Sequence, residues 1–597
     1  MKNKIYIILI SIFALWSCND YEEVPVEYYT LPYVFSPTDS IGTDAKRYLN
    51  NVYSILTKDN GGSGYNKLGG GTDTDFLDAA SDDAISSSLT ESPAYKLQTA
   101  GYSASIRISG EMGWGNWYKG IRWANTFINN IDVVPFREKY SNHVGIGMPL
   151  NRVLKAEARF LRAFYYFELV KRYGGVPLMG NIPYELGEDI ELPRGTFEDC
   201  IEYIVSEIDA VKDSLRSAPI PNVATYGHAP TVGSALALKA RVLLYAASPL
   251  FNGNSIEEDN PYIGYTDISA DKVADRWKKA ADAADYLMKE WGPDGRNVYA
   301  LVDDFRRAFL DYNNSETLFH TQNNPNFDVE RANGPVGFTQ NAAGNGCTSP
   351  TQNLVDAFPM LDGKPRGESK YAYDMRTMYD NRDPRLKYTV IHNGSRWLST
   401  TIQTYTGGRH NPSGVSMQKT KTTYYLRKFM GLFEDQNVYS NIYRNWISFR
   451  YAEVLLNYAE AKNEHDLATG KATVDASVLD AIRALRKRAG IEEGGGTYGI
   501  ENNTTCEDMR EIIRNERRIE LAFEEHRFYD IRRWRIAEDI FKEPLKGLML
   551  IMRAGNIEPP VVIDVQKAKF EKHQYLYPLP YGEVNKNVNM EQNPGWK

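Results

Sequence analysis

The stretch RVLKAEARFLRAFYYFELVKRY at residues 152–173 decides the fold class of this chain. Its apolar residues recur every three or four positions, which predicts a helix, and additional phenylalanines widen the apolar face. Such a helix is covered by neighbours on more than one side. Gly174, Gly175 and Pro177 end it, because glycine accepts the left-handed cap conformation and proline cannot continue the helical hydrogen bonds. The apolar positions are Leu154, Ala158, Leu161, Tyr165 and Leu169, with Phe160, Phe164 and Phe167 beside them.

The same periodicity recurs along the chain and predicts helices in consecutive pairs. Ala156 stands four residues before Phe160, a small-to-large spacing typical of tetratricopeptide helix pairs. The segment from about 320 to 444 is rich in Asn, Gly, Pro and Thr, which indicates loops and short strands. We therefore predict a mainly α fold, with tetratricopeptide-like helix pairs as a scaffold, long irregular loops and a few short β-strands. Further helices are expected at 197–215, 232–247, 272–290, from 446 onward and at 475–489, and strands at 386–391 and 424–429.

The N-terminus predicts export and a lipid anchor. Two lysines precede an apolar run at residues 5–15, which is too short to span a bilayer but suits a signal peptide. The run ends in Leu15-Trp16-Ser17-Cys18, which looks like a bacterial lipobox, although Trp16 is bulkier than usual. Acylation of Cys18 after cleavage would anchor the protein stably. Plain secretion, with Cys18 incidental, is the alternative. The acidic, proline-containing residues that follow read as an extended tether.

Composition describes a folded protein and excludes several classes. Of 597 residues, 42% are hydrophobic and 24% charged, and the formal net charge of −8 has no basic block to hold phosphates, so nucleic acid is not an expected partner. The 40 tyrosines exceed what a core needs, so some rings are expected to serve a surface. Cys200, Cys347 and Cys506 are too few and too widely spaced for a disulfide framework.

The sequence matches none of the catalytic or metal-binding motifs with which we compared it. The chain contains neither G-x-S-x-G nor H-E-x-x-H, and its histidines are scattered. The glycine-rich loop at 60–71 lacks the lysine of a phosphate-binding loop. The aspartates at 73–83 lack the glycine and glutamate of a calcium loop, and we interpret them as caps and turns. We expect no catalytic residue, cofactor or metal. A surface glycoside hydrolase stays an alternative, because the separation of two carboxylates cannot be read from sequence.

The segment 507–535 mixes arginines with glutamates at three- and four-residue spacing and resembles one long charged helix. We predict that most of these arginines pair with local carboxylates, and that Thr504 and Glu507 form a capping box. The preceding helix carries Glu453, Asn457, Glu460 and Glu464 on one face. An ion-pair network between the two helices is favoured over a ligand site.

Four of these segments also carry a resemblance to a known family. WISFRYAEVLLNYAEAKNE at 446–464, IRALRKRAG at 482–490, IRNERRIELAFEEHRFYDIRRW at 513–534 and YLYPLPYGEVNKNVNMEQNPGW at 575–596 are similar, in order, to motifs of the SusD/RagB outer-membrane nutrient-binding lipoproteins. The sequences AEARFLRAFYYFELVKRYGGVPL at 156–178, LVDAFPMLDG from 354 and NRDPRL from 381 resemble further family landmarks. The resemblance spans nearly the whole mature chain.

The resemblance implies a lipoprotein on the outer membrane that faces the cell exterior. Such a protein binds oligosaccharides and delivers them to a SusC-like TonB-dependent transporter; peptides or another nutrient are the alternative ligand. The implied organisation is a signal peptide at 1–17, a tether at 18–40, a helical SusD-like region at 41–320 and a RagB/SusD region at 321–597, loop-rich to 445 and helical from 446.

Flat aromatic rings suit the apolar face of a sugar, while amides and arginines bind its hydroxyl groups, and loops on a rigid scaffold are the expected place. We assign Trp117 and Tyr118 to the core, because they begin an apolar helical stretch. The candidates chosen from the loops on this basis are Tyr65, Tyr102, Trp114, Asn116, Trp397, Tyr405 and Arg409.

Overall fold

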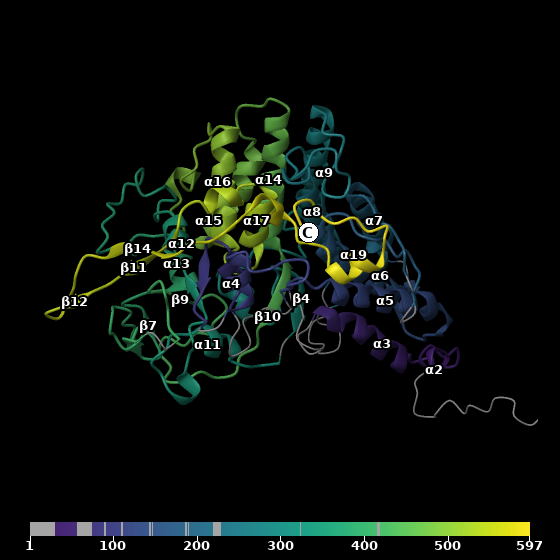
Figure 1. The fold of residues 1–597 in the computed structure, drawn as a ribbon, viewed down its shortest axis with the longest axis horizontal. Helices are drawn as coiled ribbons and strands as arrows, with labels where there is room; N and C mark the ends of the chain where they lie inside the picture. Colours follow the sequence, from purple (N-terminus) through teal and green to yellow (C-terminus); the bar gives the residue numbers. More distant parts are fainter. Residues whose placement is uncertain are drawn as a thin grey trace, which may run out of the picture.

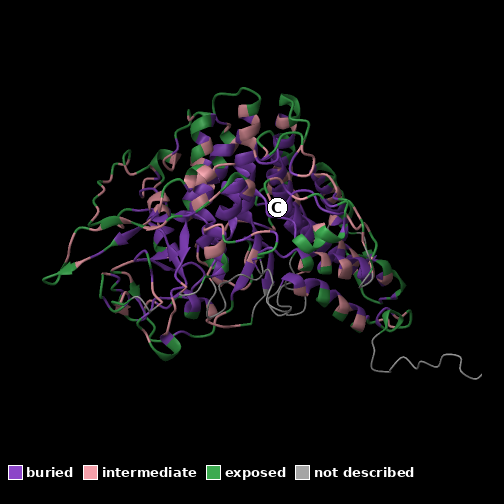
Figure 2. Cartoon of the chain, viewed as in Figure 1, coloured by how far each residue is buried: buried purple, intermediate pink, exposed green. Residues whose placement is uncertain are grey.

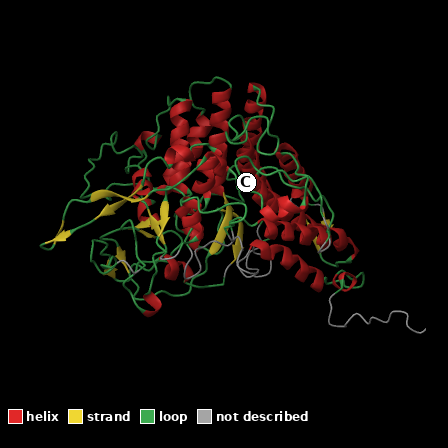
Figure 3. Cartoon of the chain, viewed as in Figure 1, coloured by secondary structure: helices red, strands yellow, loops and turns green. Residues whose placement is uncertain are grey.

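The computed structural model describes residues 30–56, 75–88, 91–108, 111–141, 145, 147–184, 188, 190–218, 229–322, 324–414 and 418–596. Helices dominate this part of the chain, and most of the strands lie at the centre and on the left side of the molecule in Figures 1 and 3. The longer helices are α3 (Thr43–Tyr53), α5 (Trp114–Asn130), α6 (Leu150–Tyr173), α7 (Phe197–Val211), α8 (Val232–Ala247), α9 (Ala270–Trp291), α14 (Tyr451–Ala468), α15 (Ala476–Ala489), α16 (Cys506–Glu520) and α17 (His526–Arg533). Shorter ones are α2 (Leu31–Val34), α4 (Pro93–Gln98), α10 (Arg307–Leu310), α11 (Asp328–Asn333), α12 (Gln352–Ala357), α13 (Leu386–Thr389), α18 (Ala537–Ile540) and α19 (Tyr581–Lys586).

The long helices pack on their neighbours in chain order, as the tetratricopeptide-like prediction requires. Helix α6 lies between α5 and α7, and α8 packs on α7 and α9. The loop-rich insertion then separates α9 from α14 in sequence, yet these two helices pack together, and α14 also contacts α15 and α16. The mainly α fold class is confirmed.

The strands of the described chain form two-stranded antiparallel sheets. The pair β4 (Thr317–Gln322) and β10 (Asn445–Arg450) lies near the middle of the molecule, where it joins the loop-rich insertion to the helices (Figure 1). The other pairs are β1 (Ala84–Ser86) with β5 (Thr348–Pro350), β2 (Lys139–Ser141) with β3 (Gly147–Pro149), β6 (Val390–Ile391) with β9 (Tyr425–Leu426), β7 (Arg396–Trp397) with β8 (Thr400–Thr401), β11 (Leu545–Met549) with β14 (Val561–Gln566) and β12 (Met552–Arg553) with β13 (Asn556–Ile557).

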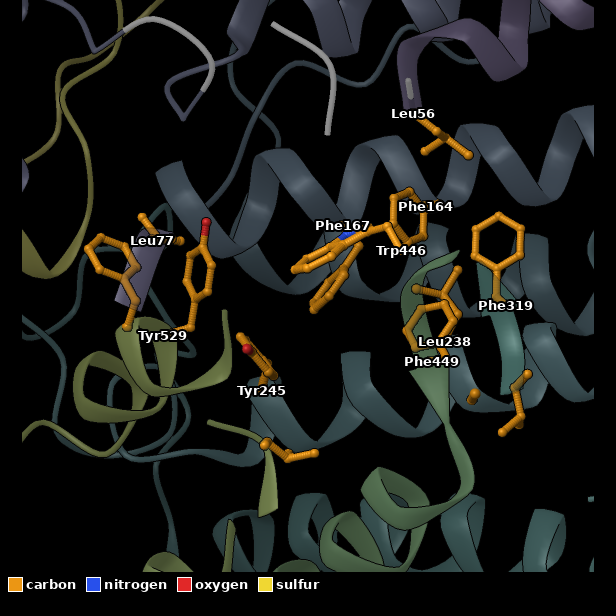
Figure 4. Close-up of a cluster of buried hydrophobic side chains, with 14 of the residues drawn as sticks. Leu56, Leu77, Phe164, Phe167, Leu238, Tyr245, Phe319, Trp446, Phe449 and Tyr529 are labelled. Carbon is orange, nitrogen blue, oxygen red and sulfur yellow. The ribbon is translucent and has the colours of Figure 1, made fainter. Parts of the chain in front are cut away.

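One core connects the helical scaffold to this central strand pair. Phe164 on α6 packs edge-on against Phe319 of β4 and Phe449 of β10, at ring-centroid distances of 5.9 Å in both cases (Figure 4). Buried residues run continuously through both halves of the molecule (Figure 2). The exposed loops therefore stand on a rigid base.

Several expected boundaries are wrong, and tertiary contacts explain why. Residues 446–450 form β10 rather than the start of a helix, because they pair with β4. The charged segment breaks after Glu520, where Phe523 and Glu525 adopt left-handed backbone angles, and resumes as α17. Its cap is Thr505, which accepts from the backbone N–H of Asp508. The first four residues of the expected strand 386–391 form α13, while its last two pair with β9 as expected.

The ion-pair network exists, but only three of the eight arginines at 507–535, Arg514, Arg533 and Arg535, pair with a carboxylate three residues away. The other partners are more distant in sequence. Arg518 pairs with Asp82 and Asp83, and Arg533 pairs with Glu460. The prediction that most arginines pair locally is therefore wrong, and two of the aspartates interpreted as caps are ion-pair partners. Burial alone would raise the pKa of Glu460, but Arg533 and the other donors outweigh it and lower that pKa to about 2.

Candidate functional site

Two of the predicted ligand residues lie in a buried aromatic chain. Tyr102 packs edge-on against Tyr577 at 5.8 Å, Tyr577 contacts Tyr173, and Tyr173 packs edge-on against Trp114 at 5.1 Å. Tyr102 is 5% exposed and Trp114 4%. The prediction that Trp114 lies on an exposed loop is wrong, because it begins α5 and faces α6. Trp117 is buried as expected, whereas Tyr118, also assigned to the core, packs against the core but is only half-buried.

Trp397 is also a core residue, contrary to its assignment to a surface loop. It is 0% exposed, and its indole N–H donates to the hydroxyl of Tyr439 at 3.1 Å. Tyr439 in turn contacts Phe327, which is half-buried, at 6.2 Å. Trp397 is thus the inner end of an aromatic chain that leads outward through Tyr439 to Phe327.

The remaining predicted ligand residues differ in how far they are exposed to solvent. Tyr405 and Arg409 lie in two consecutive turns: the backbone N–H of Gly408 donates to the carbonyl of Tyr405, and that of Asn411 donates to the carbonyl of Gly408. Tyr405 is partly exposed, and the exposed Arg409 stacks its guanidinium on Phe338 at 4.8 Å. Asn116 lies partly exposed on α5. Tyr65 and the lipobox cysteine Cys18 lie outside the described residues, so the structure does not test them.

A pair of surface tyrosines that the sequence analysis missed lies next to the central strands. Tyr443 is 54% exposed and packs edge-on against the half-buried Tyr312, with ring centroids 5.2 Å apart and an interplanar angle of 65°. Tyr443 precedes β10, and Tyr312 lies between α10 and β4. We call these two residues the tyrosine pair.

The backbone on both sides of the tyrosine pair is fixed. Ile442 exchanges two backbone hydrogen bonds with Asn326, each of 3.1 Å. Arg444 donates to both carboxylate oxygens of the buried Glu330 at 2.8 Å. The side chain of Asn445 donates to the carbonyl of Tyr312 at 2.8 Å. Rings held in this way lose little entropy when a ligand stacks on them.

Amide side chains accompany the rings. Asn313 follows Tyr312, Asn441 stands two residues before Tyr443, and Asn324 lies two residues after the end of β4. All three are exposed. Rings supply apolar contact area, and amides supply both donors and acceptors. This chemistry suits reversible binding of a ligand that has flat apolar faces and many hydroxyl groups.

A sequence signal for the pair exists in retrospect. Both rings lie in asparagine-rich segments, DYNNSE at 311–316 and SNIYRN at 440–445, that flank the strands β4 and β10. The two segments are far apart in sequence, and in the antiparallel register 440–445 lies beside the end of β4 rather than its start. Only the fold of the loop before β4, which brings Tyr312 onto Tyr443 and Asn445, shows that they meet.

No metal centre is found beside this surface within the described residues. No cluster of three histidine, cysteine, aspartate or glutamate side chains there could hold a metal ion. Cys200, Cys347 and Cys506 are buried free thiols. None of the described helices combines the length and the apolar character needed to cross a bilayer.

The chain is similar in sequence to known proteins. The SusD family model matches residues 305–596, and a second model, described as starch-binding and associating with the outer membrane, matches residues 31–244. SusD-like protein P2 of Formosa agariphila is 24% identical over 490 residues, which are 81% of this chain and 80% of the relative.

Solved structures agree on the fold. A SusD-like protein from Bacteroides fragilis aligns with a TM-score of 0.71 and 26% identity over 93% of this chain and 98% of its own. A laminarin-binding SusD-like protein aligns with a TM-score of 0.60 and 20% identity, covering 93% of this chain and 99% of its own. The tetratricopeptide-like scaffold, the four motifs in order and both family models lead to one conclusion: the chain belongs to the SusD/RagB family.

Proposed function

We propose that this protein is a cell-surface glycan-binding lipoprotein that captures oligosaccharides and delivers them to a SusC-like TonB-dependent transporter in the outer membrane. The observation that carries glycan binding is the tyrosine pair, with 54% of Tyr443 exposed on a fixed backbone. Two structural relatives, a laminarin-binding SusD-like protein and a surface glycan-binding protein of Bacteroides fluxus, support the same ligand class.

Membrane attachment through Cys18 follows from the lipobox, and the family model that names outer-membrane association supports it. Cys18→Ala is expected to leave the fold intact and to release the protein from the membrane, because the anchor consists of acyl chains alone. The fractionation is done in cells without the transporter, so that a protein partner cannot retain the variant. A variant that still fractionates wholly with the outer membrane would contradict the anchor.

The ligand is tested with the soluble form that begins after Cys18. Isothermal calorimetry across a panel of polysaccharides identifies the best glycan, and the same titration is repeated with Tyr443→Ala. The matched control is Tyr581→Ala, which removes a ring of similar exposure, 56%, from α19. Weakened binding in Tyr443→Ala alone supports the site; equal affinities in all three proteins would remove the tyrosine pair from it.

The same preparation separates binding from catalysis. On this proposal the best glycan is recovered intact after long incubation with the pure protein. Release of shorter saccharides by the wild type and by Tyr443→Ala would instead indicate a hydrolase.

A further inference from the structure

A pocket of about 470 Å³ opens beside the N-terminal half of α5. Its other walls come from the segment after α6 and from the chain around α19, so it is separate in sequence from the tyrosine pair. The residues that give it its character are Trp114, Tyr118, Met179, Ile182, Leu192 and Met590.

Four polar side chains of this pocket are already engaged in holding its walls together, because each donates to a backbone carbonyl of the surrounding chain and so fixes the pocket shape. Three charged side chains of the lining, Lys119, Glu188 and Glu583, are exposed. The hydroxyl of Tyr118 donates to Pro177 at 2.9 Å, Arg122 Nε to Tyr184 at 2.6 Å, the amide of Asn125 to Ile182 at 2.9 Å and the amide of Asn587 to Leu192 at 2.7 Å. What these bonds leave for a ligand is mainly apolar surface.

We propose that this pocket is a second binding site, which takes a neutral aromatic molecule of one or two rings. Its volume falls in the range of small-molecule pockets. Aromatic rings and methionine thioethers are favourable partners for an aromatic ligand. The charged groups at the wall, Lys119 and Arg122 against Glu188 and Glu583, balance in sign and select no ionic ligand.

The pocket differs from the tyrosine pair in the chemistry that it offers. The amides and the phenol of the walls are already bonded, so a sugar could reach mainly the exposed charged groups Lys119, Glu188 and Glu583. Its other hydroxyl groups would be buried without partners, which is costly. The site is therefore independent of the proposed glycan binding, and either proposal can fail without the other.

The experiment uses 6-propionyl-2-(dimethylamino)naphthalene, a neutral two-ring dye whose emission shifts to shorter wavelength in apolar surroundings. The soluble chain is expected to bind it saturably with one molecule per chain. Ile182→Asp places a charge at the pocket wall and is expected to raise the dissociation constant about tenfold or more, since it replaces an apolar contact. Ile182→Lys is expected to do the same, which shows that loss of the apolar contact rather than the sign of charge matters.

The matched control is Ile268→Asp, because Ile268 is 49% exposed against 54% for Ile182 and does not line the pocket. Its dissociation constant should stay within about twofold of the wild type. Binding that does not saturate, or equal weakening in all three variants, overturns the proposal. A saturating glycan should leave dye binding unchanged, and displacement of the dye by the glycan would overturn the separation of the two sites.

Discussion

Glu460 on α14 and Arg533 at the end of α17 form a buried ion pair, with Arg533 Nη2 donating to Glu460 Oε2 at 2.7 Å and the indole of Trp534 donating to the same carboxylate at 2.7 Å. Both side chains are almost completely buried, at 4% and 1% exposed. The pair joins two helices that are separated by α15 and α16 in the sequence. It lies in the scaffold rather than among the exposed loops.

Glu460→Ala is expected to lower the free energy of unfolding by about 3–5 kcal/mol, because Arg533 would stay buried without this partner. Urea unfolding followed by circular dichroism measures the loss. Glycan affinity under native conditions should not change. Weaker binding at an unchanged melting temperature would indicate a ligand site here instead.

Arg518→Ala is expected to have a similar cost, of about 3–5 kcal/mol. Arg518 holds Asp82 and Asp83 at 2.8 and 2.6 Å, and both carboxylates would lose a partner in a buried place. The matched control is Arg307→Ala, since Arg307 is also paired with two aspartates but is 54% exposed. Exposed pairs contribute about 0–1 kcal/mol, so that variant should unfold close to the wild type. Equal losses in the two variants would show that burial does not set the cost.

Helix periodicity predicted the scaffold well because it depends on local spacing. Helix α8 has the expected bounds, and α6 and α9 differ from expectation by two residues or fewer at either end. Residues 446–450 carry the same kind of apolar pattern, yet they form a strand because β4 lies beside them. A partner that is distant in sequence decided the local structure there, and periodicity contains no information about it.

The site was harder to predict for a related reason. Trp114 and Trp397 occur in glycine-containing segments typical of loops, but each ring is enclosed by residues from elsewhere in the chain, such as Tyr173 and Tyr439. Composition predicts that a segment is a loop, but it does not predict which aromatic side chains of the loop are exposed to solvent. Tyr443 has an equally loop-like context and is exposed.

The buried tyrosines predict sensitivity to alkali. Burial raises the pKa of Tyr102 and of Tyr173 to about 12 in the folded chain, against 10.0 for a free tyrosine. The folded state therefore holds these protons longer than the unfolded state. Their contribution to stability is complete below pH 10 and is lost as the pH rises through about 12.

Melting temperature measured between pH 8 and 12 should accordingly stay level at first and then fall steeply above pH 10. Tyrosinate absorbance should rise late and together with unfolding, whereas the chain in urea should titrate near pH 10. Ionisation of most tyrosines near pH 10 in a chain that keeps its native circular dichroism would contradict this prediction.

Trp397→Ala is expected to destabilise the protein by about 3–5 kcal/mol, the usual cost of removing a fully buried large aromatic side chain. Trp397→Phe keeps an aromatic ring but removes the hydrogen bond to Tyr439 and part of the indole volume, so its cost should be smaller, about 1–3 kcal/mol. Thermal unfolding separates the two. If Trp397→Ala melts like the wild type and loses glycan affinity, Trp397 belongs to the binding surface after all.

The tyrosine pair makes a prediction that distinguishes one ligand surface from two independent rings. Tyr443→Ala should weaken binding of the best glycan by about 1–3 kcal/mol, which is roughly a five- to hundredfold rise in dissociation constant. Tyr312→Ala should also weaken it, because Tyr312 supports the exposed ring at 5.2 Å. Since the effect of Tyr312 passes partly through Tyr443, the double variant should lose less affinity than the sum of the two single losses, by about 0.5–1.5 kcal/mol. Melting temperatures should stay close to the wild type, because one ring is 54% exposed and the other half-buried. Losses that simply add would show that the rings contact the glycan separately.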